Sequence, residues 1–110
     1  MAMDNYAIIT VPDRNDSMAR VVLNETEYMI RFTYNYAGDY WKFGIYTAMD
    51  EPIAIGVKIV PNFPLNVFYT VTGLPLGVFA AITNLDRIGR NDFKDGKARF
   101  IFAPAPSSGS

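Results

Sequence analysis

The chain contains neither cysteine nor histidine. Without them, the Ser–His–Asp and Cys–His nucleophile pairs cannot form within one chain. Zinc sites built from histidine and cysteine are excluded for the same reason. Enzymes that rely on carboxylate, lysine or tyrosine chemistry alone are a minority. We therefore expect no enzyme activity, no catalytic residue, no cofactor and no small-molecule substrate, in a protein suited to a reducing compartment.

An excess of charge of one sign is also missing. Ten lysines and arginines oppose eleven acidic residues, so the net charge is −1. Such a balance gives no overall attraction to nucleic acid or to an anionic membrane. Long apolar runs are lacking too, because a typical one, residues 76–82, is far shorter than the ~20 residues that cross a bilayer. The polar residues 1–6 do not resemble a secretory signal. We expect a soluble protein made in a cytoplasm, without membrane insertion.

Apolar residues, in contrast, are plentiful. Half of the 110 residues are hydrophobic and 15% are aromatic, a balance opposite to that of a disordered chain. This length fits one domain. We predict a single β domain over residues 1–103. Residues 104–110 are rich in alanine, proline, serine and glycine, which predicts a flexible C-terminal tail.

The hydrophobic period is two residues, which is typical of half-buried strands. Apolar and polar positions alternate in several segments, with Tyr28, Ile30 and Phe32 opposite Met29 and Arg31, for example. The predicted class is therefore all-β, a small antiparallel β-barrel or β-sandwich of about seven strands, of which the first five form a meander. The predicted strands span residues 6–11, 18–23, 27–34, 40–48, 53–60, 76–83 and 98–103.

The alternation also assigns inward faces. One register buries two apolar sets from adjacent strands, namely Trp41, Phe43 and Ile45 on the first strand and Ile53, Ile55, Val57 and Ile59 on the second. Residues 35–39 form the preceding hairpin loop, in which Gly38 can take a positive φ.

The aromatic residues of this hairpin have two interpretations. A platform that stacks bases or sugars needs exposed aromatic side chains beside basic ones, and only Arg31 and Lys42 lie nearby. Because Trp41 and Phe43 share a face, we favour a core or a protein interface. The alternative is an OB-like module that binds single-stranded nucleic acid or glycans.

Two long loops offer candidate sites. Residues 61–77 are apolar and carry three prolines, and long irregular connections tend to be functional. We predict that they contact a partner protein and include one helical turn at residues 65–69. The alternative is a lid over the open end of the barrel. The candidate partner interface consists of Phe63, Leu65, Phe68, Tyr69 and Leu74 from this loop, with Arg87 and Arg90 from the next one.

Residues 84–97 form the second loop, and its charges are mixed. Arg87, Arg90 and Lys94 could contact phosphates, but interleaved aspartates such as Asp92 lower the local field. We therefore do not expect nucleic-acid binding. Oxygen ligands occur here as well, but their spacing departs from an EF-hand, so no metal is expected.

The order of these elements resembles the small baseplate plug family of tailed bacteriophages over residues 6–103. The resemblance rests on short segments in a fixed order, namely Ile8-Ile9-Thr10-Val11-Pro12, then Tyr28-Met29-Ile30-Arg31-Phe32, then Trp41-Lys42-Phe43-Gly44-Ile45-Tyr46, then Gly56-Val57-Lys58-Ile59-Val60, then Leu74-Pro75-Leu76-Gly77, and finally Asn91-Asp92-Phe93 before the last strand.

The sequence departs from that family after the acidic pair. There, Phe93 and Lys94 replace a leucine and a glycine, and the glycine is delayed to Gly96. The resemblance implies a structural virion protein of the tail baseplate, made in the host cytoplasm, that packs as a plug against hub and tube proteins. It supplies no catalytic residues.

Overall fold

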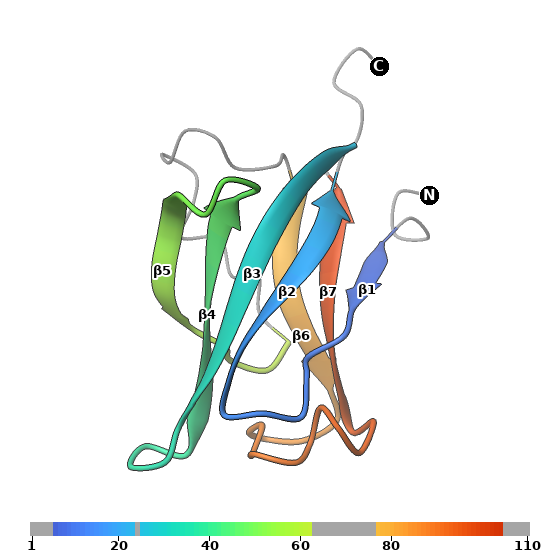
Figure 1. Cartoon of the computed structure of the whole chain (residues 1–110). Helices are drawn as coiled ribbons and strands as arrows, with labels where there is room; N and C mark the ends of the chain where they lie inside the picture. The colour runs from blue at the N-terminus through green and yellow to red at the C-terminus, as the bar shows by residue number, and fades with distance from the viewer. Residues whose placement is uncertain (1–5, 24, 63–76, 105–110) are drawn as a thin grey trace.

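A computed structural model describes residues 6–23, 25–62 and 77–104. These residues form seven strands in two antiparallel sheets, which face each other as a sandwich (Figure 1). The all-β prediction is confirmed, and of its two forms the sandwich is the one observed. The strands are β1 (Ala7–Ile9), β2 (Asp16–Leu23), β3 (Thr26–Asn35), β4 (Tyr40–Thr47), β5 (Pro52–Lys58), β6 (Gly77–Thr83) and β7 (Ala98–Pro104).

Four consecutive strands form the larger sheet, in the order β2-β3-β4-β5. The smaller sheet has the order β1-β7-β6. The predicted five-stranded meander is therefore wrong in its first member. β1 pairs with β7, which places Ile9 opposite Phe100 inside the core. The two open sheets also differ from the five-stranded partly open barrel of an OB-fold, so the fold assumed by the alternative interpretation is not observed.

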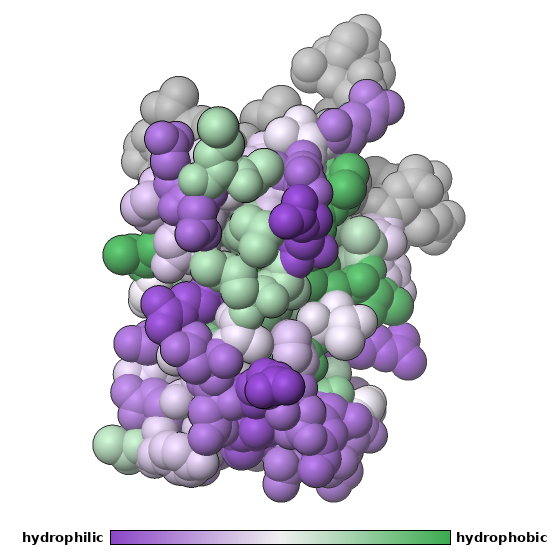
Figure 2. Space-filling model, in the orientation of Figure 1, coloured by the Kyte–Doolittle hydropathy of each residue, from purple (hydrophilic) through white to green (hydrophobic). Residues whose placement is uncertain are grey.

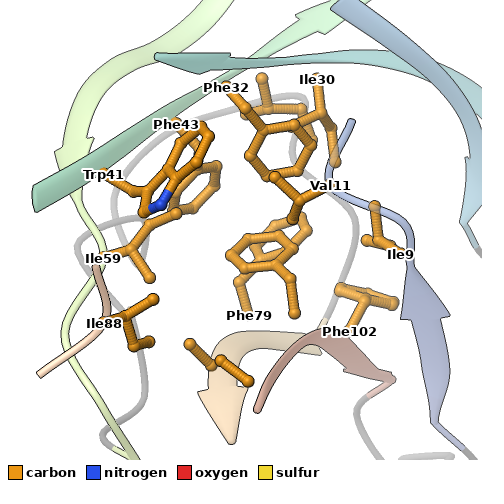
Figure 3. Close-up of a cluster of buried hydrophobic side chains, with 14 of the residues drawn as sticks. Ile9, Val11, Ile30, Phe32, Trp41, Phe43, Ile59, Phe79, Ile88 and Phe102 are labelled. Atoms are coloured by element: carbon orange, nitrogen blue, oxygen red, sulfur yellow. The ribbon is translucent and has the colours of Figure 1, made fainter. Parts of the chain in front are cut away.

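The core lies between the two sheets, and seven of its sixteen described buried residues are aromatic (Figure 3). Phe32 and Phe43 from the larger sheet meet Phe100 from the smaller one, with ring centroids 5.2 and 5.0 Å apart and steep interplanar angles. Edge-to-face pairs of this kind add about 0.5–1.5 kcal/mol each beyond the burial of their area. Trp41, Phe43 and Ile45 all point inward, as their alternation predicts.

β5 departs from the predicted alternation. Ile53 and Val57 pack against the core and Ile59 is buried, but Ile55 is 63% exposed. The register explains this, because Phe43 pairs with Val57 whereas Ile45 pairs with Ala54. Two residues of β5 therefore oppose one residue of β4, which is a β-bulge. Gly56, with a φ of 71°, takes the left-handed conformation that this bulge requires.

The β3–β4 hairpin turns without a positive φ at Gly38. Asp39 adopts that conformation instead, with a φ of 56°. Position 38 is close to the ring of Tyr40, so that a Cβ atom there would displace this ring. The loop is therefore in the predicted place, and its glycine serves close packing.

The last strand ends near the predicted end of the domain. β7 extends to Pro104, one residue past the predicted domain end. Residues 105–110, and the helical turn predicted for residues 65–69, lie outside the described residues. Within the described ranges, no helix has the length and apolarity that crossing a membrane requires.

Candidate functional site

Three loops meet at the lower end of the sandwich in Figure 1, and two candidate residues lie there. Arg90 donates from Nε to Oδ1 of Asn15 at 2.5 Å and from Nη1 to Oδ1 of Asp13 at 3.0 Å. Arg87 forms an ion pair with Asp39 and donates to its backbone carbonyl at 3.1 Å. Both arginines therefore tie the β6–β7 loop to other loops of the same chain.

The buried side chain of Trp41 anchors this loop to the core. Its Nε1 donates to the carbonyl of Gly89 at 3.1 Å, and the ring of Phe93 packs against the indole with centroids 5.8 Å apart. The guanidinium of Arg90 lies over the indole at 5.6 Å, a cation–π contact. Since only 1% of Trp41 is exposed, the core interpretation of this aromatic residue is confirmed, and it is not available as a stacking platform.

Asp92 stabilises the folded conformation of the same loop. Oδ2 of Asp92 accepts a hydrogen bond of 2.6 Å from the backbone N–H of Gly89, and the carbonyl of Asp92 accepts one from Lys97. Across the described ranges, acidic side chains do not gather in groups of three that could hold a metal ion. The Asp92 side chain therefore organises the loop itself.

The outer face of the larger sheet, here called the charged face, carries ion pairs between neighbouring strands. Figure 2 shows hydrophilic residues over much of this face, with hydrophobic ones between them. Arg31 donates from Nε to Oδ1 of Asp16 at 2.7 Å and from Nη2 to Oδ2 at 2.6 Å. Nη1 of Arg20 forms an ion pair with Oε2 of Glu27 at 2.8 Å. The hydrogen bond from Arg31 lowers the pKa of Asp16 below its usual range. The same bond, and a second one to Tyr46, raise the pKa of Arg31.

A shallow hollow of about 290 Å³ lies on the charged face beside the β5 bulge. Lys42, Gly44 and Ile55 are among the residues that line it. Lys42 lies opposite Lys58 in the register, and like charges in that position destabilise a sheet slightly. Lys58 rests over the ring of Tyr40, 4.6 Å from the centroid, so that part of this cost is offset.

The outer face of the smaller sheet, here called the apolar face, is different. Phe79, Phe100 and their alternating neighbours point into the core, so the residues between them point outward. Ile8 is 57% exposed and Ile82 is 47% exposed. Arg99 is the one charged side chain at the outward positions of the three strands, which are Ile8, Val78, Ala80, Ile82, Arg99, Ile101 and Ala103.

Sequence reasoning did not select this face. The sequence nevertheless contained the indication. In a strand with one solvated face, apolar and polar residues alternate, but in residues 77–83 apolar residues occupy both the odd and the even positions. Of the residues that were selected, the structure brings Arg87 and Arg90 to one end of the molecule. Phe63, Leu65, Phe68, Tyr69 and Leu74 lie outside the described residues.

The chain is thus a small β-sandwich whose two outer faces differ, one charged and one apolar. A family model described as "Cyanophage baseplate Pam3 plug gp18" matches residues 6–105. The chain belongs to this family of phage baseplate plugs, as the order of its sequence segments indicated. No curated protein matches the chain significantly. Family membership indicates a structural role in the tail baseplate of a virion, in association with other tail proteins.

Proposed function

We propose that this chain acts as a plug that packs against hub and tube proteins, filling or capping the lumen near the end of the tail tube. The observation that carries the proposal is the apolar face of β1, β7 and β6. Contiguous apolar surface on a small protein marks an interaction site. Burying it gains roughly 25 cal/mol for each Å² removed from water. A neighbouring tail protein is the occupant that family membership favours.

The long apolar loop supports a second contact with the same partners. Its apolar residues, Phe63, Leu65, Phe68, Tyr69 and Leu74, remain part of the proposed interface on the basis of sequence. The loop connects Asn62 to Gly77, and Gly77 begins β6, an edge strand of the apolar face. Arg87 and Arg90 would take part from the loop end, where 62% of the Arg87 side chain is exposed.

The proposal also covers how the protein reaches the virion. We propose synthesis in the cytoplasm of the bacterial host, followed by incorporation during tail assembly. No catalytic step is needed, because a plug acts by filling space and by the affinity of its surfaces.

Incorporation into virions tests the proposed function. A phage that lacks its own plug gene would be complemented with the wild-type chain or with a variant that carries Ile8→Asp and Ile82→Asp. Both positions are exposed, so the variant should fold, with an unchanged circular dichroism spectrum. It should nevertheless be lost from purified virions, because two charges would be buried at the interface.

Met49→Asp is the matched control, since it places an acid on an exposed apolar position in the β4–β5 turn, away from the apolar face. This variant should enter virions as the wild-type chain does. Normal incorporation of the Ile8→Asp, Ile82→Asp variant would show that the apolar face is not the docking surface.

A further inference from the structure

The four edge strands of the sandwich are protected to different degrees. An edge strand offers unpaired N–H and C=O groups to any passing chain, and proteins usually block it. β5 begins with Pro52, ends with Lys58 and contains the bulge at Gly56. β1 is three residues long. Each of these features is a known way to prevent strand addition.

β6 is blocked by another part of the chain. Pro61 forms a bridge to Ala81, and the backbone N–H of Asn62 donates to the carbonyl of Ala81 at 2.7 Å. The side chain of Asn62 then pairs with both backbone groups of Thr83, at 2.7 and 2.9 Å. At Ala81 and Thr83, Asn62 thereby occupies hydrogen-bonding positions that a neighbouring strand would use.

Among the residues that the structure describes, none gives β2 any of these protections. It is eight residues long, contains no proline or glycine, and pairs with β3 in an unbroken register from Asp16 to Leu23. Its two charged side chains are both neutralised by ion pairs with β3, Asp16 by Arg31 and Arg20 by Glu27. The strand is therefore a long, regular and electrically neutral edge.

The register shows which backbone groups face outward. The N–H of Tyr34 donates to the carbonyl of Asn15 at 2.8 Å, so positions 15 and 34 form a hydrogen-bonded pair. Such pairs alternate along an antiparallel ladder. Residues 17, 19, 21 and 23 therefore bond to β3, whereas residues 16, 18, 20 and 22 direct their N–H and C=O groups away from it.

Side chains beside this edge are also incompletely covered. Met18 is 42% exposed and Val22 is 66% exposed on the outer side. Ala19 and Val21 point inward and pack against the core, but they remain only half-buried. One further strand beside β2 would cover apolar side chains on both surfaces of the sheet.

We propose that the free edge of β2 accepts an extended segment of another tail protein, which adds a fifth strand to the larger sheet. Main-chain hydrogen bonds would supply the affinity in this mode of recognition, and alternate side chains the specificity. The segment should be uncharged and apolar at alternate positions, because Arg20 and Asp16 already have partners. A second copy of this chain fits less well, since new pairs between their charges would have to break the existing ones.

This inference rests on the proposed function, and hydrogen exchange measured on the intact particle tests it. In the free protein, the amides of residues 18, 20 and 22 should exchange quickly, whereas those of residues 19 and 21 are protected by β3. In purified tails, the amides of residues 18, 20 and 22 should slow by about tenfold or more, as new hydrogen bonds form. Unchanged exchange at these three positions would overturn the proposal.

Proline substitutions provide a second, independent test. Met18→Pro removes an outward N–H and leaves the β2–β3 ladder intact, so the protein should fold but fail to enter virions. Met18→Ala keeps the N–H and should be incorporated. Ala19→Pro removes an inward N–H and should destabilise the free protein, which confirms the register. Incorporation of Met18→Pro at the wild-type level would contradict strand addition.

The outcomes separate this inference from the proposed function. If the Ile8→Asp, Ile82→Asp variant is excluded from virions while Met18→Pro is incorporated, the apolar face docks and the β2 edge does not. Dimerisation of the free protein through β2, detected by sedimentation and abolished by Met18→Pro, would replace the partner segment with a second copy. If the wild-type chain is missing from purified tails, both proposals fail.

Discussion

The two sheets are alike on their inner faces and differ on their outer ones. Inside, both contribute aromatic side chains to one core, with Phe32 and Phe43 packed against Phe100. Outside, the larger sheet carries cross-strand ion pairs such as Asp16–Arg31, whereas Arg99 is the one charge at the outward strand positions of the smaller sheet. Core packing explains the shared inner pattern. The difference outside is what the proposed docking of the apolar face predicts.

The inner faces should be equally important for stability. Trp41→Ala in the larger sheet and Phe100→Ala in the smaller one should each lower the free energy of unfolding by about 3–5 kcal/mol, because each leaves a cavity in the core. Urea denaturation of both variants measures this. The exposed Tyr36 supplies the control, since Tyr36→Ala should change stability by less than about 0.5 kcal/mol. A loss below about 1 kcal/mol for Trp41→Ala would contradict its place in the core.

The bulge distinguishes the larger sheet from the regular ladder of β6 and β7. Gly56→Ala should cost about 1 kcal/mol, because a left-handed backbone is unfavourable for alanine. An added Cβ would meet no atom within 4 Å, so the cost is conformational and not steric. Denaturation in urea, at an unchanged m-value, should show it. Equal stability of Gly56→Ala and the wild type would mean that the bulge relaxes.

The smallest expected effect concerns the charged face, whose ion pair between Asp16 and Arg31 should make the free energy of unfolding depend on pH. Because Arg31 lowers the pKa of Asp16 in the folded state, the pair stabilises the protein above the unfolded-state pKa of about 3.9. That contribution is lost as the pH falls through the lower, folded value. Asp16→Asn should therefore be slightly less stable than the wild type at pH 7 and indistinguishable from it in strong acid.

Salt provides the matching control for this comparison. The pair is exposed, so its contribution is small and should shrink further at high ionic strength. A stability difference between Asp16→Asn and the wild type that persists unchanged in strong acid would show that the substitution acts through something other than charge.

Much of the candidate site could not be predicted from sequence. Arg87 and Arg90 were selected because they are basic residues in a long loop, yet Arg90 contacts Asp13, which is 77 positions away. No local pattern encodes such a contact. Ile8 and Ile82 could have been selected, since apolar residues at both parities of a strand indicate that neither face is left to water.

The sequence by itself determined the strands, the hairpins and the inward aromatic residues, because side-chain alternation and turn residues act over a few positions. It also determined the family, through the order of its segments. Only the tertiary structure decided that β1 leaves the meander to pair with β7, and that the bulge at Gly56 turns Ile55 outward. Both depend on which distant strands come together. That choice is made by the burial of a whole core, so no single segment specifies it.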